Sequence, residues 1–128
     1  MRFIAEVFYR YPEAHIGVLT ARDMEVVHSD PGLERMKIGA LSAAEEKIGG
    51  EPATRHPFIA SWRQMYRSFG TKPGDYRPSA EALIRRALKT GGLPSINTAV
   101  DAYNAVSVRH LIPMGGFDLD RVAGDIRL

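Results

Sequence analysis

Cysteine is absent from this sequence of 128 residues, and histidine is scarce. The lack of cysteine excludes disulfides, thiolate zinc sites and cysteine nucleophiles, and is compatible with a reducing compartment. The four histidines lie far apart, and no pair has the HxxxH or HExxH spacing that places two imidazoles on one helix face. We therefore expect no metal site and no cofactor.

Long hydrophobic runs are missing as well. No apolar stretch approaches the ~20 residues that a membrane-spanning helix requires, and Glu6 interrupts the apolar core that a signal peptide would need. We expect a cytoplasmic protein with no membrane partner. The GxSxG, GxxxxGK[ST] and GxGxxG motifs are also absent, so no motif supports an α/β-hydrolase type of esterase, an NTPase or a dinucleotide-binding protein, which does not exclude the hydrolysis of an already reactive ester.

The formal net charge is only +2, but positive charge is concentrated in the middle of the chain. Residues 55–90 contain eight Lys or Arg against two Asp or Glu, whereas residues 1–54 contain six against nine. Such a segment either binds phosphates, with an affinity that falls as salt rises, or forms the solvated surface of helices. The residues expected to bind nucleic acid are Arg63, Arg67, Lys72, Arg77, Arg85, Arg86 and Lys89.

The first 54 residues are predicted to form strands followed by a helix. Runs rich in Ile, Val and Phe at residues 3–8 and 15–21 are typical of strands, and residues 24–27 suit a third. Asp30 followed by Pro31 is a typical helix start, and Gly49 is a typical end. The apolar stripe of this helix consists of Leu33, Met36, Ala40, Leu41, Ala44 and Ile48.

Two more helices are predicted between Pro57 and Gly91. In the first, large apolar residues recur at helical spacing and are expected to anchor the core, with base stacking on the aromatic rings as the less favoured alternative. These residues are Phe58, Ile59, Trp62, Met65, Tyr66 and Phe69. Ser79 is expected to cap the second helix, and Glu81 can pair with Arg85 one turn later. The packing residues expected in that helix are Leu83, Ile84, Ala87 and Leu88.

The segment from Leu93 to Asp118 combines a helix with a glycine turn. Ser95 is expected to cap the helix, and its apolar positions should face inward. Those positions are Ile96, Ala99, Val100, Tyr103 and Val106. On another face, Asn97, Asp101 and Asn104 recur at steps of four and three residues and form a line of hydrogen-bonding groups. Pro113 then stops the helical pattern, and Gly115-Gly116 lets the backbone approach another group or present N–H groups to an oxygen.

At these residues the sequence resembles the B3/B4 domain of the phenylalanyl-tRNA synthetase beta subunit, which in bacterial enzymes hydrolyses tyrosine wrongly attached to the phenylalanine tRNA. The matching residues are Ile96, Val100, Asp101, Asn104, Pro113, Met114, Phe117, Asp118, Asp120, Arg121 and Gly124. The stretch from Trp62 to Lys89 is similar to freestanding relatives of that domain.

The resemblance implies a set of site residues. Asn104 matches an asparagine that lines the family's editing pocket, and Gly115 stands where bacterial synthetases have a pocket histidine. We therefore expect Asn104 to orient the ester or a water, with backbone N–H groups at Gly115 and Gly116 as oxyanion donors. Substrate contacts are expected at Asn97, Asp101 and Pro113. The alternative is structural: Asn104 braces the following turn, Asp101 accepts hydrogen bonds from a loop, and the glycines permit a bend.

The fold expected from these observations is α+β, with a mixed β-sheet packed against three to four helices in one domain spanning residues 1–128. Residues 1–54 form the N-terminal strands and helix, and residues 55–128 match the family best. Because the family's domain continues well past the position of Leu128, we expect it to be C-terminally incomplete here.

Three functions are compatible with the sequence. The first is a tRNA-binding module that hydrolyses mischarged aminoacyl-tRNA in trans, as an ester hydrolase. The second is a noncatalytic RNA-binding module. The third is a protein that binds a small molecule and reuses the pocket for an amino-acid-like ligand. Ligase activity is not expected, because nothing resembles an ATP-binding synthetase core. The sequence does not indicate an oligomeric state.

Overall fold

The computed structural model describes residues 3–4 and 6–128. The chain divides into two compact units, one formed by Val26–Gly115 and the other by the N-terminal residues up to Glu25 together with Gly116–Leu128. The larger unit is built from helices α2 (Pro31–Ile48), α3 (Pro57–Ser68), α4 (Ser79–Thr90) and α5 (Thr98–His110), with a short 3₁₀ turn η1 (Ala53–Arg55) between α2 and α3.

The smaller unit joins the two ends of the chain. It contains a short helix α1 (Val7–Arg10), a 3₁₀ turn η2 (Leu119–Arg121) and two short strands, β1 (Phe3–Ile4) and β2 (Ile126–Arg127). The strands pair in parallel. The Val7 N–H also donates to the Leu128 carbonyl at 3.1 Å, so backbone bonding continues past the strand pair.

The predicted mixed β-sheet is wrong. Within the part of the chain that the structure describes, strand residues occur only in the β1–β2 pair, and helices supply most of the regular structure. Residues 15–21 and 24–27, expected to be strands, are irregular, and Leu19 is 93% exposed. Of residues 3–8, the first two lie in β1, residues 7 and 8 begin α1, and residue 5 lies outside the described residues. Apolar runs were insufficient because a strand also needs a neighbouring backbone to bond.

Helix α2 begins as the sequence predicts. Asp30 is its N-cap, with the Asp30 Oδ1 atom accepting from the Leu33 N–H at 2.9 Å. Pro31 occupies the first helical position, where its missing N–H costs nothing, and Gly49 ends the helix at φ 63°. Most of the predicted stripe is buried or half-buried, but Met36 is exposed.

The core of the larger unit is made mainly of small and branched side chains. Its members are Ala44, Ile48, Ala53, Ile59, Ala80, Ile84, Val108 and Leu111, with Leu83 and Leu93 packed against them. The predicted aromatic anchor on α3 is wrong, because Ile59 alone of that stripe is buried, whereas Phe58 and Phe69 are exposed. Trp62, Met65 and Tyr66 are half-buried.

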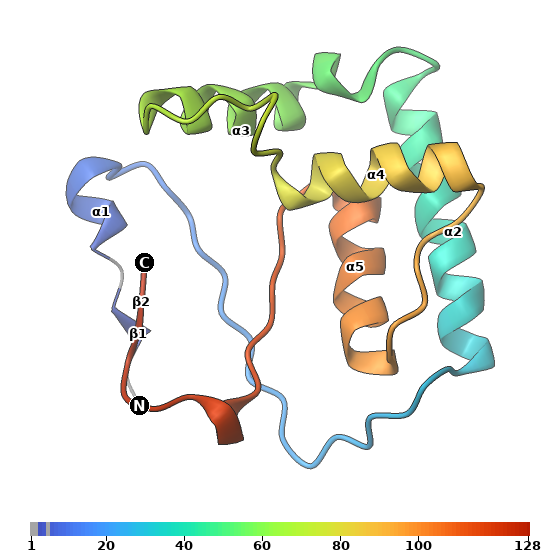
Figure 1. Ribbon diagram of the computed structural model, residues 1–128. Coiled ribbons are helices and arrows are strands. Elements are labelled where there is room, and N and C mark those ends of the chain that lie inside the picture. The colour runs from blue at the N-terminus through green and yellow to red at the C-terminus, as the bar shows by residue number, and fades with distance from the viewer. Residues whose placement is uncertain (1–2, 5) are drawn as a thin grey trace. The chain divides into compact units, whose positions relative to one another are not determined.

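Helices α2 and α5 lie side by side and run in the same direction, with α4 across their ends (Figure 1). Two contacts establish the direction: Lys37 reaches Asp101 near the start of α5, and Lys47 donates to the Arg109 carbonyl near its end. Ser79 does not cap α4 as predicted, since Pro78 precedes the helix and no side chain accepts from its first turn. Leu88, expected to pack, is exposed, while Ile84 and Ala87 are buried.

Candidate functional site

The first turn of α5 is fixed by Asn97, not by Ser95 as predicted. Asn97 has an extended backbone, and its Oδ1 atom accepts from the Val100 N–H at 2.9 Å. This side-chain bond satisfies one of the N–H groups that a helix start leaves unpaired. The Asn97 side chain is therefore committed to the helix start, and its predicted contact with substrate stays a prediction.

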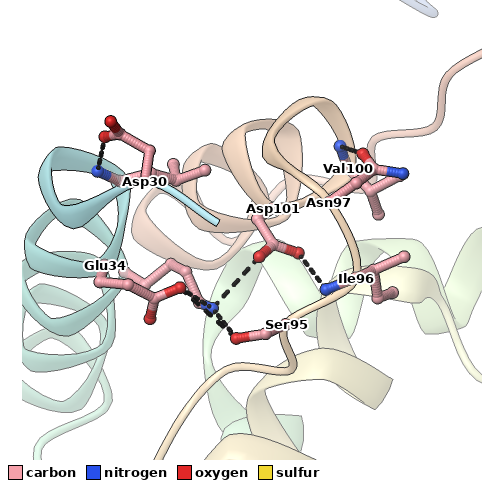
Figure 2. A network of polar contacts seen from close by, with 9 residues as sticks. Asp30, Glu34, Ser95, Ile96, Asn97, Val100 and Asp101 are labelled. Carbon is pink, nitrogen blue, oxygen red and sulfur yellow. Dashed lines mark hydrogen bonds and ion pairs between the residues drawn. The ribbon is translucent and has the colours of Figure 1, made fainter. Parts of the chain in front are cut away.

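Asp101 is buried at the junction of α5 with α2, where it is 1% exposed. One carboxylate oxygen accepts from the Ile96 N–H at 2.9 Å, and the other lies 3.2 Å from the Lys37 Nζ atom. Figure 2 shows Asp101 facing the Ser95–Ile96 segment that leads into α5. Both oxygens are thus engaged inside the protein, as the structural alternative anticipated.

Lys37 is the centre of this network, and sequence reasoning did not single it out. Its ammonium donates to Glu34 at 3.0 Å, to the Ser95 hydroxyl at 2.7 Å and to Asp101. Burial lowers the pKa of Lys37, but the hydrogen bonds to Glu34 and Asp101 and the attraction of their charges outweigh it, so the pKa is raised above its ordinary value. Lys37 therefore stays charged at neutral pH.

The face that α5 buries differs from the predicted one. The predicted inward positions Ala99, Val100, Tyr103 and Val106 are only half-buried, and Ile96 is exposed. The buried residues of the helix are Asp101, Asn104, Ala105, Ser107 and Val108. The polar line predicted to lie on a separate face thus turns toward the interior, where Lys37 compensates the charge of Asp101.

Asn104 lies on this buried face and is only 7% exposed. Among the residues that the structure describes, its side-chain amide has no hydrogen-bond partner. The side chain lines a shallow depression of about 350 Å³. The other lining residues are Ser79, Ala82, Leu83, Arg86, Tyr103 and Met114. No buried side-chain nitrogen or oxygen of the described residues lacks a partner, so the unbonded Asn104 amide is accessible from the depression and available to a ligand or water.

The turn after α5 is closed by Ser107. Its hydroxyl donates to the Ile112 carbonyl at 2.7 Å, and the Ile112 N–H donates back to the Ser107 carbonyl at 3.1 Å. Leu111 ends the helix at φ 57°, and Pro113 beyond it is half-buried. The turn thus carries the chain from the helix end to Met114 at the depression.

The two predicted donor glycines belong to different units. Gly115 ends the larger unit, is exposed, and has neither a positive φ nor a neighbour within 4 Å of an added Cβ. Its conformation therefore does not require glycine. Gly116 begins the smaller unit, so its role as a donor to a ligand at Asn104 stays a prediction.

Two of the seven predicted nucleic-acid contacts are held by a buried carboxylate. Arg63 Nη1 lies 2.9 Å from both oxygens of Glu81, which is fully buried, and Arg85 Nη1 lies 3.6 Å from one of them. The pairing of Glu81 with Arg85 is confirmed. Arg63, by contrast, ties α3 to α4.

The remaining five predicted contacts are exposed: Arg67, Lys72, Arg77, Arg86 and Lys89. No ion pair involves any of them within residues 3–4 and 6–128. These five cations, which we call the free cations, are the members of the predicted set that no carboxylate of the described residues engages.

Sequence reasoning missed most of the depression's lining. Ser79, Ala82, Leu83 and Arg86 recur at steps of three and four residues, so they share one face of α4. That spacing was readable, but nothing in it indicated that this face would lie beside Asn104.

A sequence model of the B3/4 domain family matches residues 61–128, more than half of the chain and inside the stretch that resembled the family most. This protein belongs to the B3/4 domain family, and is thereby related to the phenylalanyl-tRNA synthetase beta subunit. No curated protein and no solved structure matches the chain.

Two other kinds of site do not occur in the described residues. No helix there is long and apolar enough to cross a membrane. In the same residues, His, Asp and Glu side chains do not gather in groups of three or more that would suit a metal ion.

Proposed function

We propose that this protein is a tRNA-binding module of the B3/4 family. It binds aminoacyl-tRNA and, in trans, hydrolyses the ester that joins a wrongly attached aromatic amino acid to the tRNA. The observation that carries the proposal is Asn104, a residue only 7% exposed whose side-chain amide has no partner among the described residues and lies in the lining of a depression of the helical unit. Membership of the B3/4 family supports tRNA as the class of substrate.

The free cations support the binding part of the proposal. A tRNA backbone is polyanionic, and Lys and Arg that are not consumed by internal carboxylates release counterions when they meet phosphates. Arg67, Lys72 and Arg86 come from three successive segments, α3, the loop after it, and α4. Binding through them is electrostatic and weakens as salt rises.

The chemistry proposed for the depression needs no protein nucleophile. An aminoacyl ester is already activated and carries a neighbouring ribose hydroxyl, so holding the ester and a water together supplies much of the rate. The Asn104 amide offers two N–H donors and a carbonyl acceptor, which suit an ester carbonyl and a water. The Gly115 N–H, which has no partner among the described residues, is the proposed backbone donor to the oxyanion.

The test is a deacylation assay on tyrosine and phenylalanine esters of the phenylalanine tRNA, with wild type, Asn104→Ala and Gln64→Ala. Gln64 is an exposed amide on α3 outside the depression, so its variant controls for loss of an amide elsewhere. We expect selective release of tyrosine, slowed ~100-fold by Asn104→Ala, as for other oxyanion-hole donors, and unchanged by Gln64→Ala. Equal rates for the two variants would remove Asn104 from the reaction.

A noncatalytic RNA-binding role is the second candidate, and one observation favours it. The lining of the depression contains no His, Asp or Glu, so it offers no general base. Salt-dependent tRNA binding without any release of tyrosine, at protein concentrations well above the dissociation constant, would establish this candidate instead.

A further inference from the structure

The lining of the Asn104 depression contains a positively charged side chain and no negatively charged one. Arg86 is its single ionisable group of either charge apart from the Tyr103 phenol, and the lining includes no carboxylate. Ser79 and Tyr103 add hydroxyls, and Ala82, Leu83 and Met114 add apolar surface. The single charge in the lining of the depression is therefore the positive charge of Arg86.

Arg86 differs from the arginine beside it in the sequence. Arg85 pairs with Glu81, whereas the Arg86 guanidinium has no ion pair among the described residues. A guanidinium presents a planar fork of N–H donors that matches the oxygens of a carboxylate or a phosphate. Arg86 thus offers an anion both charge and geometry at the edge of a partly apolar surface.

We propose that the Asn104 depression binds an organic anion, with its carboxylate or phosphate oxygens on Arg86, a neutral polar group on Asn104 and its apolar part over Leu83 and Met114. This rests on the proposed function only in placing a ligand at Asn104. The same chemistry has two sources, the 5′-phosphate of the terminal adenosine of a tRNA and the carboxylate of a small amino-acid-like ligand.

The absence of a carboxylate from the lining has a second consequence for recognition. An aminoacyl ester carries an ammonium group, and no lining residue offers it an opposite charge. Selectivity at this site therefore depends on the anion and not on the amine. We therefore expect acetylation of the ligand's amine to leave its binding intact.

The experiment is calorimetric titration of the full chain with two matched pairs of probes. AMP is compared with adenosine, and N-acetyltyrosine with N-acetyltyrosine amide, so that each pair differs by one anionic group. We expect at least one anion to bind about tenfold more tightly than its neutral counterpart. Preference for AMP assigns the phosphate source, and preference for N-acetyltyrosine assigns the carboxylate source.

Three variants test whether Arg86 is the source of the preference for an anion. Arg86→Ala should reduce the affinity for the anion to that for the neutral probe, and Arg86→Lys should retain part of the preference. Arg35→Ala, which removes an exposed arginine of α2 outside the depression, should change neither affinity. Circular dichroism of each variant confirms that helix content is retained.

Three results would overturn the inference: equal affinities within both pairs, no binding of any probe at millimolar concentration, or equal effects of Arg86→Ala and Arg35→Ala. The proposed function is judged separately. Tyrosine release from tRNA without any preference for the anions would retain the proposed function and reject this inference. Anion binding without tRNA binding would retain this inference and reject the proposed function.

Discussion

The Lys37 Nζ atom lies 3.2 Å from Asp101 Oδ2, although the two residues are 64 positions apart in the sequence. Lys37 is 3% exposed and Asp101 1% exposed. The pair fixes the start of α5 against α2, and the same helix carries Asn104 in its next turn. The geometry of the candidate site therefore depends on an ion pair outside its lining.

Replacing Lys37 by Met should destabilise the protein by about 3 kcal/mol, because it leaves the Asp101 carboxylate buried without its counter-charge. The free energy of unfolding, from urea titrations at neutral pH, measures the effect. Lys89→Met removes an exposed lysine and should change stability by less than about 0.5 kcal/mol. Equal losses in the two variants would show that the buried pair is not important for stability.

Lys37 should also make stability depend on alkaline pH. Its pKa is raised in the folded state, so its contribution to stability is fully present below the unfolded pKa of about 10.5 and is lost as pH rises through the folded pKa. The difference in urea midpoint between wild type and Lys37→Met should therefore be constant up to pH ~9.5 and narrow above pH ~10.5. A difference that stays constant to pH 11.5 would contradict this assignment.

Glu81 provides a comparison between two arginines on one buried carboxylate. Arg63→Ala removes both 2.9 Å contacts and should cost about 2 kcal/mol or more, since Glu81 then keeps only the contact with Arg85 at 3.6 Å. Arg85 is about half exposed, and Arg85→Ala should cost less than about 1 kcal/mol. The urea unfolding curves of the two variants test this order, and the reverse order would refute it.

The free cations and the arginines on Glu81 should differ in tRNA binding. Replacing Lys72, Arg77 or Arg86 by Ala should each lower the slope of log affinity against log salt by about one, as expected for loss of one phosphate contact. Arg85→Ala should lower it less, because Glu81 already neutralises that charge. Fluorescence anisotropy with labelled tRNA between 50 and 300 mM salt measures the slopes. An unchanged slope in all three variants would place the tRNA elsewhere.

Local patterns in the sequence were sufficient for the boundaries of α2, but not for the residue that starts α5 or for which helix faces are buried. Asp30-Pro31 and Gly49 correctly predicted α2 because capping depends on a few adjacent residues. The buried face of α5 was predicted wrongly, since its small apolar residues lie on several sides and only the presence of Lys37 makes burial of Asp101 tolerable. That partner belongs to another helix and cannot be read from α5 alone.

The candidate site was only partly predictable, again because the local sequence does not show which residues of other helices lie beside it. Asn104 was singled out through the resemblance to the B3/4 family, and its place in the lining of the depression is consistent with a pocket residue. Arg86 was grouped with six other basic residues because charge along the chain does not distinguish a cation held by Glu81 from a free one. Only the three-dimensional placement of α4 beside α5 brings Arg86 to the depression of Asn104.

The most direct test of the account follows the side-chain amide of Asn104 by ¹H–¹⁵N NMR, which suits a chain of 14.2 kDa. The ligand is an acceptor-stem hairpin carrying tyrosine through a non-hydrolysable amide at its 3′ end, and the exposed Gln64 amide serves as the internal control. We expect the Asn104 amide signals to shift saturably during the titration, while those of Gln64 stay in place. Saturable binding of the hairpin with no change at Asn104 would contradict the account, because the aminoacyl end would then lie outside the depression.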